Sequence, residues 1–222
     1  MKLFRGHLAL AFLFLSSTSL GSTYCSDLLA HIAHAQFEIA PFAETPRTIM
    51  HPLNEADIDR VTEIVADGRV AASAGKRLSR FEVETRVLES RLLPGEKDWN
   101  YTFVGIYSRA DGSLTGVISI KKASPEFLTR LPRSVQPTEG RCAAVFGYAL
   151  APSAWGKGIT TEAAKEFVAR SFSRGGITAI YADVASDNVA SIRVLEKIGF
   201  KKLDTGPRAV ENIFELKAPT LH

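Results

Sequence analysis

Residues 147–172 read GYALAPSAWGKGITTEAAKEFVARSF: an apolar strand enters a turn bracketed by Gly156 and Gly158, and an amphipathic helix follows at once. Glycine at both positions leaves the backbone free for a tight turn and for close approach of a ligand. The N–H groups from about Gly156 to Thr161 have no partner inside such a helix, so their partial positive charge favours a phosphate group. Lys157 adds a full charge beside them. The pattern therefore predicts an anion site, although an ordinary strand–turn–helix connection has the same pattern.

The sequence on both sides of this stretch predicts a mixed α/β sheet in a single domain. Apolar segments with strand-like patterns lie at residues 47–53, 101–108, 114–120, 142–150, 179–185 and 212–218. Helical spacing begins at Asn54 and recurs at residues 79–93, in the quoted stretch and at residues 187–199. Residues 110–112 form a hairpin turn signal between two strands. Residues 123–141 contain three prolines and show no periodicity, which predicts a long loop.

The first 36 residues differ from the rest of the chain and are left out of the predicted domain, which spans residues 37–222. Lys2 and Arg5 precede an apolar run at residues 8–15, and no acidic residue occurs before Asp27. This pattern is typical of a secretory signal, with a small-x-small cleavage site at residues 33–35. It also fits a disordered or mistranslated leader, or an organellar targeting segment. The apolar run is too short to span a membrane.

Composition narrows the class of protein. A net charge of +3 is too small to indicate nucleic-acid binding. The five histidines and two cysteines do not stand at metal-ligand spacing, so no metal site is expected. Cys25 lies in the leader, so we do not expect it to form a disulfide with Cys142.

Two linked segments resemble the GNAT superfamily of acyl-coenzyme A-dependent N-acetyltransferases, and most closely its ribosomal-protein-alanine acetyltransferase branch. The first is the quoted stretch, and the second is SDNVASIRVLEKIGF at residues 186–200. Residues 45–47 and 52–53 also resemble the first strand of the family. The residues that carry the resemblance are Gly147, Tyr148, Pro152, Trp155, Gly156, Lys157, Gly158, Thr161, Glu162, Ala163, Asp187, Asn188, Ser191, Glu196, Lys197, Ile198, Gly199 and Phe200.

The resemblance implies a mostly antiparallel sheet whose two central strands, 142–150 and 179–185, splay apart between flanking helices. The anion would be the pyrophosphate of acetyl-coenzyme A, the co-substrate, and the pantetheine arm would lie in the gap between the strands. Asn188 would contact that arm or the thioester end, although it also fits a plain helix cap. Tyr148 and Trp155 also fit packing roles. The implied cofactor-binding residues are Tyr148, Ala149, Leu150, Trp155, Gly156, Lys157, Gly158, Ile159, Thr160, Thr161 and Asn188.

Departures from the family pattern limit the catalytic candidates. Leu195 stands where many members have a general-acid tyrosine, and Val145 stands where the branch often has a glutamate. Ser191, one turn before Leu195, is the nearest hydroxyl and is the candidate acid, although a small residue there also suits close helix packing. Glu162 is a catalytic candidate that also fits a plain charge in the first helical turn. Asp183 is a further candidate carboxylate.

These features predict an enzyme that transfers an acetyl group from acetyl-coenzyme A to a primary amine, by direct attack in a ternary complex. The amine must be neutral. At pH 7, deprotonating a lysine of pKa ~10.4 costs roughly 4–5 kcal/mol, against about 1.4 kcal/mol for an α-amine near pKa ~8. A site without an evident base therefore favours a protein or peptide α-amine. A small-molecule amine (an antibiotic, amino acid or polyamine) is the alternative acceptor, and a noncatalytic acyl-coenzyme A-binding module is the alternative class.

The sequence gives weaker indications of location and partners. Acetyl-coenzyme A is a cytosolic and organellar metabolite, so we expect a cytoplasmic domain, monomeric or homodimeric, with no integral membrane span. A secreted protein is the alternative if residues 1–36 act as a signal. Arg130, Arg133 and Arg141 fit contact with an acidic acceptor, and they equally fit a solvated loop.

Overall fold

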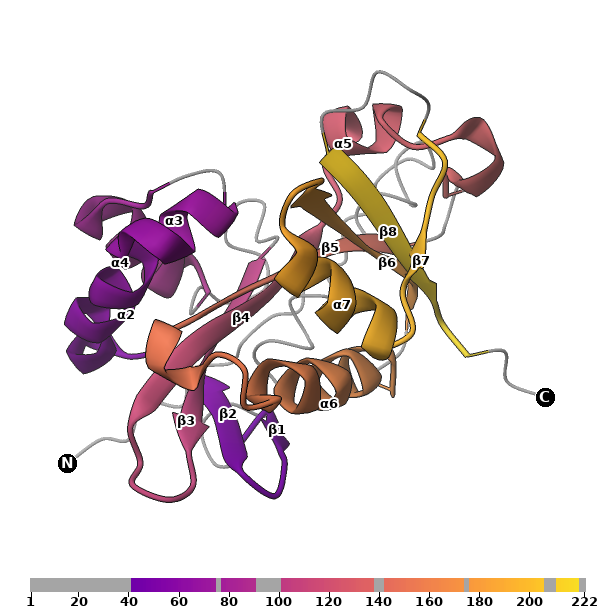
Figure 1. Cartoon of the computed structure of the whole chain (residues 1–222). Coiled ribbons are helices and arrows are strands. Elements are labelled where there is room, and N and C mark those ends of the chain that lie inside the picture. Colours follow the sequence, from indigo (N-terminus) through magenta and orange to yellow (C-terminus); the bar gives the residue numbers. More distant parts are fainter. Residues whose placement is uncertain are drawn as a thin grey trace, which may run out of the picture.

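The computed structural model describes residues 41–74, 77–90, 101–137, 142–173, 176–205 and 211–219. These residues form an eight-stranded sheet with the order β1-β2-β3-β4-β5-β6-β8-β7 (Figure 1). Neighbouring strands are antiparallel except β5 and β6, which are parallel. The predicted fold class, a mixed α/β domain with a mostly antiparallel sheet, is therefore confirmed. The strands are β1 (Ala43–Glu44), β2 (Thr48–Pro52), β3 (Tyr101–Ser108), β4 (Leu114–Lys122), β5 (Cys142–Leu150), β6 (Ile177–Ala185), β7 (Lys201–Lys202) and β8 (Glu211–Lys217).

Helices cover both faces of this sheet. Figure 1 shows α6 and α7 side by side and α5 near β8 at the opposite end, while α2 and α4 contact β4 and β3, and α3 contacts β5 and β6. Short 3-10 turns precede α2 and α6, and another follows α5. The α-helices are α2 (Ile58–Ala66), α3 (Gly68–Ala74), α4 (Arg80–Glu89), α5 (Pro125–Thr129), α6 (Ile159–Ser173) and α7 (Val189–Lys197), and the 3-10 turns are η1 (Glu55–Asp57), η2 (Arg133–Val135) and η3 (Pro152–Ala154).

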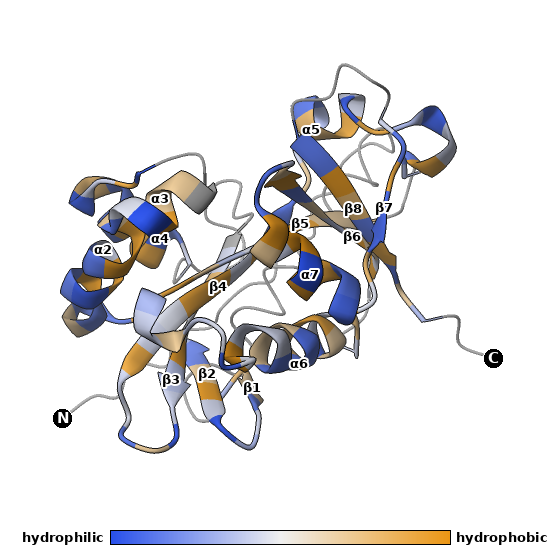
Figure 2. Ribbon diagram, viewed as in Figure 1, coloured by the Kyte–Doolittle hydropathy of each residue, from blue (hydrophilic) through white to orange (hydrophobic). Residues whose placement is uncertain are grey.

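Strand β5 is buried on both faces because its side chains alternate between two parts of the core. Ala144 and Phe146 pack with α6 and α7, whereas Ala143 and Val145 pack with the segment around α5. This explains the nearly continuous apolar sequence of the strand. Figure 2 shows that the helices carry both hydrophobic and hydrophilic residues, as expected for helices with one face on the core.

The predicted helix starts are confirmed by capping contacts. The side chain of Asn54 accepts a hydrogen bond from the Ala56 N–H (2.8 Å), and the Asp57 side chain accepts one from the Asn54 N–H (2.9 Å). Ser79 and Glu82 form the same reciprocal arrangement at the start of α4. Such capping boxes satisfy backbone donors that the first helical turn leaves unpaired. The predicted end of this second helix, near residue 93, lies outside the described residues.

The prediction of a long loop over residues 123–141 is wrong where α5 and η2 form. The Ser124 hydroxyl caps α5 by accepting from the Phe127 N–H (3.2 Å), and Pro125 occupies the first turn. Phe127 and Leu131 are buried against β5, β6 and β8. A helix of five residues is too short to show a periodic pattern, and tertiary packing stabilises it.

Other features were not predicted. The strands β1 and β7 are only two residues long and depend on their neighbours for pairing. Contrary to expectation, Cys142 is disulfide-bonded, and Cys25, the other cysteine of the chain, lies outside the described residues. The predicted leader also lies outside them. In the described part of the chain, no helix is long and apolar enough to cross a membrane.

Candidate active site

The two central strands separate halfway along their length. The pairing of β5 with β6 runs from Cys142 opposite Ile177 to Val145 opposite Tyr181 and ends there. Beyond this point β5 remains paired with β4 as far as Leu150, and β6 remains paired with β8. The predicted splay is therefore confirmed. As a result, residues 146–150 are paired with β4 on one side and are not paired with β6 on the other.

The divergent end of β5 leads directly into the glycine turn. Gly156 and Gly158 have φ angles of +71° and +73°, a region that favours glycine. Helix α6 begins at Ile159, and the Glu162 N–H donates to the Gly158 carbonyl (3.1 Å). The amides before Glu162 therefore precede the first closed helical turn, where backbone donors lack intrahelical acceptors. A Cβ built on Gly156 meets no atom within 4 Å, so that side of the turn is open.

Trp155 connects the end of β5 to this turn. Its indole Nε1 donates to the carbonyl of Leu150 (2.9 Å), while 42% of the residue remains exposed. The hydrogen bond fixes the partly exposed ring at the start of the turn. This arrangement suits a wall of the predicted binding site.

Tyr148 and Ser191 approach each other across the splay, from β5 and α7. The hydroxyl oxygen of Tyr148 is buried and has no hydrogen-bond partner among the described residues. Burial raises the pKa of Tyr148 to about 12, and the nearby Ser191 hydroxyl acts in the opposite direction. The two hydroxyls thus lie close together without a well-formed hydrogen bond. A buried, unpartnered polar atom at this point is consistent with a site that a polar ligand completes.

Helix α7 follows Asn188 and contains Ser191, and it has Leu195 where many family members have a general-acid tyrosine. The side chain of Asn188 caps the helix by accepting a hydrogen bond from the Ser191 N–H (3.1 Å). Asn188 therefore has the helix-cap role that the sequence also allowed. Leu195 is 2% exposed and packs in the core with α6. Val145 is also buried, beside Tyr181. Neither position carries a proton donor or acceptor in its side chain.

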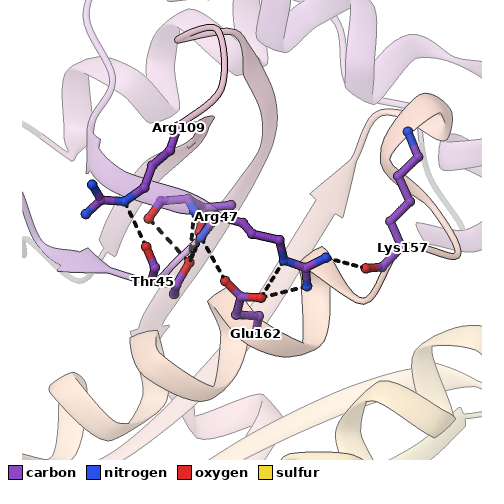
Figure 3. Close-up of polar contacts among 6 residues, drawn as sticks. Thr45, Arg47, Arg109, Lys157 and Glu162 are labelled. Atoms are coloured by element: carbon purple, nitrogen blue, oxygen red, sulfur yellow. Dashed lines mark hydrogen bonds and ion pairs between the residues drawn. The ribbon is translucent and has the colours of Figure 1, made fainter.

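Glu162 is held by Arg47, which lies between β1 and β2 (Figure 3). One carboxylate oxygen accepts from the Arg47 backbone N–H (3.1 Å), and the other accepts from Nε (2.7 Å) and pairs with Nη2 (2.6 Å). Burial pushes the pKa of Glu162 up, but hydrogen bonds from Thr45 and Arg47 outweigh it and leave the pKa below its usual value. A carboxylate of lowered pKa is a weaker base.

The remaining sequence candidates are paired elsewhere. Arg130 donates to Asp183 (3.0 Å) and to Glu211 (2.6 Å), and its guanidinium lies over the ring of Phe127 (5.2 Å). Asp183 therefore neutralises a cation near the C-terminal end of β6, and Arg130 is already matched with acidic groups. Arg141 lies outside the described residues. In the described part of the chain, no cluster of three or more His, Cys, Asp or Glu could hold a metal ion.

Arg47 is the site residue that sequence reasoning missed. Its side chain also donates from Nη1 to the carbonyl of Lys157 (2.7 Å), in the middle of the glycine turn. Arg47 belonged to a segment that resembled the first strand of the family, but nothing in the sequence indicated a contact with the turn.

Comparisons with known proteins agree with this geometry. The family described as "Acetyltransferase (GNAT) domain" matches residues 47–201. A relative from Bacillus subtilis, "Uncharacterized N-acetyltransferase YoaA", is 24% identical over 73% of this chain and 84% of its own length.

Two solved structures from Vibrio cholerae share the fold. A putative ribosomal-protein-serine acetyltransferase has a TM-score of 0.56 at 17% identity, covering 79% of this chain and 96% of its own. A spermidine N-acetyltransferase in complex with CoA and spermine has a TM-score of 0.58 at 14% identity, covering 78% and 97%. Since the family match spans well over half of the sequence, this chain belongs to the GNAT acetyltransferase family and is an acyltransferase.

Proposed function

We propose that this enzyme transfers the acetyl group of acetyl-coenzyme A to the α-amine of a protein or peptide. The observation that carries the proposal is the separation of β5 from β6 after Val145 and Tyr181, which continues into the glycine turn before α6. The unpaired strand edge can bind an extended ligand, and the helix N-terminus that follows it can bind an anionic group at the end of that ligand.

Each part of the co-substrate then has a matching part of the chain. The amides of residues 156–161 and the charge of Lys157 would hold the pyrophosphate. The backbone of residues 146–150 would pair with the pantetheine arm, because β6 no longer occupies that edge. Trp155 would form a wall of the channel, and Asn188 and Tyr148 would lie toward the thioester end.

The chain's own contribution to the chemistry is binding, orientation and proton handling. Acetyl-coenzyme A supplies a thioester carbonyl that a neutral amine can attack. Ser191, next to the Tyr148 hydroxyl, would donate a proton toward the departing thiolate. Glu162 is held by Arg47 with a lowered pKa, so we assign it to the support of the turn and leave proton abstraction to the acceptor's own ionisation.

The acceptor would approach from the other face of the sheet. Gly147 lies on that face, between the core under α2 and α4 and the core under α5. A Cβ built on Gly147 meets only the Ser119 hydroxyl, at 3.5 Å, within a 4 Å radius. The missing side chain thus leaves room above the strand, opposite the face that carries Tyr148.

A transfer assay with three acceptors tests the proposal. A peptide with a free α-amine, an Nα-blocked lysine peptide and spermidine are each supplied with acetyl-coenzyme A, and thiol release and acetylated product are both measured. We expect transfer to the α-amine at neutral pH. Preferential transfer to spermidine would favour a small-molecule acceptor, and binding without transfer to any amine would favour a noncatalytic module.

A further inference from the structure

We propose that Arg47 is a positioning residue for coenzyme A: its guanidinium holds the Lys157 carbonyl and the Glu162 carboxylate together, and so fixes the pyrophosphate turn in its ligand-ready shape. This inference rests on the proposed function, because it assumes that the glycine turn binds coenzyme A. It adds to that site a residue that lies 110 positions before Lys157 in the sequence, in the N-terminal part of the domain.

The geometry shows one side chain joining two parts of the turn. Nη1 donates to the Lys157 carbonyl at 2.7 Å, while Nε and Nη2 reach the Glu162 carboxylate at 2.7 and 2.6 Å (Figure 3). Lys157 lies before α6 and Glu162 lies in its first turn. A planar guanidinium presents donors in fixed directions, which lets it bridge two acceptors at once.

Arg47 is itself held in place by the sheet. Its carbonyl accepts from the Arg109 N–H (2.9 Å), and the Arg109 side chain donates to the Thr45 carbonyl (2.8 Å) and pairs with Glu44. Thr45 and Thr48 are buried and their hydroxyls share a hydrogen bond (2.8 Å). The backbone that carries Arg47 is therefore bonded to the end of β3 and to a buried pair of threonines.

The contact with Lys157 fixes the orientation of a peptide group. In a planar trans peptide, the carbonyl of one residue and the N–H of the next point in opposite directions. With the Lys157 carbonyl directed at Arg47, the Gly158 N–H points away from Arg47 and is available to an anion. Because Gly158 lies on one side of this peptide, the peptide rotates more easily than one between two larger residues unless such a contact restrains it. Arg47 would therefore reduce the ordering that binding requires.

The contact with Glu162 has an electrostatic consequence. A carboxylate in the first turn of α6 suits the helix dipole, but it would repel a pyrophosphate at the same helix end. Pairing with Arg47 cancels that charge locally. Because the pair is partly exposed (side-chain exposure of 49% and 23%), its effect on folding stability is small. We therefore expect the consequence of losing Arg47 to appear in ligand binding.

Calorimetric titration of coenzyme A into the wild type and four variants tests the role of Arg47. We expect Arg47→Lys to raise the Kd about tenfold, because an ammonium can keep the Glu162 pair but cannot also hold the Lys157 carbonyl. Arg47→Ala should raise it at least as much. Glu162→Gln should lower the Kd at low ionic strength, because the amide oxygen can still accept from Arg47 and so support the turn while the negative charge is removed, and salt should reduce this gain.

Arg80→Lys is the matched control, because Arg80 also bridges two acidic side chains, Asp59 and Glu84, but on α2 and α4 away from the turn. It should bind coenzyme A like the wild type. Steady-state kinetics should show the effect of Arg47→Lys in the KM for acetyl-coenzyme A, with kcat and the KM for the amine little changed.

The results separate this inference from the proposed function. If the wild type fails to bind coenzyme A, the proposed function fails first. If the wild type binds and Arg47→Lys binds equally well, only the role of Arg47 is overturned. A fall in affinity for Glu162→Gln equal to that for Arg47→Ala would also overturn it, since it would indicate a simple structural pair. Arg47→Lys retains the ion pair, so it remains informative if Arg47→Ala does not fold.

Discussion

Val145 and Tyr181 are the last residue pair that joins the two central strands of the sheet. Past this pair, β5 follows β4 and β6 follows β8, so the backbone of residues 146–150 is left beside the gap. The gap leads to Gly156 and to the N-terminus of α6. The functional proposal depends on this continuity between an unpaired strand edge and an anion-binding helix end.

The preferred acceptor should change with pH in a specific way. At pH 7 an α-amine of pKa ~8 is neutral roughly 200 times more often than a lysine of pKa ~10.4. We expect kcat/KM for an α-amino peptide to exceed that for a blocked lysine peptide at pH 7 and to level off above about pH 8. The lysine value should keep rising beyond pH 9. A lysine profile that is already flat near pH 7 would reveal an efficient base and contradict the proposal.

The Tyr148 hydroxyl should matter for turnover and not for stability. Removing a buried hydroxyl that lacks a partner is neutral or stabilising, so Tyr148→Phe should leave the Tm unchanged or higher. If the hydroxyl assists Ser191, kcat should fall by about 10- to 100-fold, and Tyr148→Phe combined with Ser191→Ala should lose little more. Unchanged kcat in both single variants would show that the pair only packs β5 against α7.

Gly147 should control access for the amine. In Gly147→Ala the new methyl group contacts the Ser119 hydroxyl at an ordinary distance, so the strand should fold normally. We expect the KM for the α-amino peptide to rise several-fold while the Kd for coenzyme A stays the same, because the methyl group lies on the acceptor face. A weaker affinity for coenzyme A with no change in the amine KM would place the acceptor elsewhere.

The Arg47–Glu162 pair should make a small contribution to stability that is sensitive to acid. Because the folded-state pKa of Glu162 is lowered, its stabilising effect is complete above the ordinary glutamate pKa of about 4.3 and is lost as pH falls through the folded-state pKa. Thermal unfolding between about pH 3 and 6 should therefore show a Tm difference between wild type and Glu162→Gln that shrinks toward low pH. A difference that grows on acidification would contradict the direction of the shift.

The central motif could be predicted from sequence because its signals are local. Gly156 and Gly158 permit the positive φ angles that the turn adopts, and the helix after them has a regular apolar face, so strand, turn and helix follow from adjacent residues. The helix start at Asn54 could be predicted for the same reason, since a capping box involves residues only three positions apart.

The parts that could not be predicted depend on distant residues. Arg47 and Glu162 are 115 positions apart, and their contact exists only because β1 and β2 place a turn beside α6. Helix α5 has five residues and forms because Phe127 is buried. The pairing of Asp183 with Arg130 likewise needs the α5 segment to fold back over β6.

Titration of coenzyme A into the wild type, Gly156→Asp and Gly112→Asp tests the central claim most directly. Gly156 and Gly112 have φ angles of +71° and +70°, and a Cβ meets nothing within 4 Å at either site, so the backbone strain of the two variants is matched. We predict saturable binding to the wild type and to Gly112→Asp, and a loss of at least about tenfold in Gly156→Asp, where a negative charge enters the pyrophosphate site. Folded wild-type protein that does not bind millimolar coenzyme A, or equal binding by the two variants, would contradict the account.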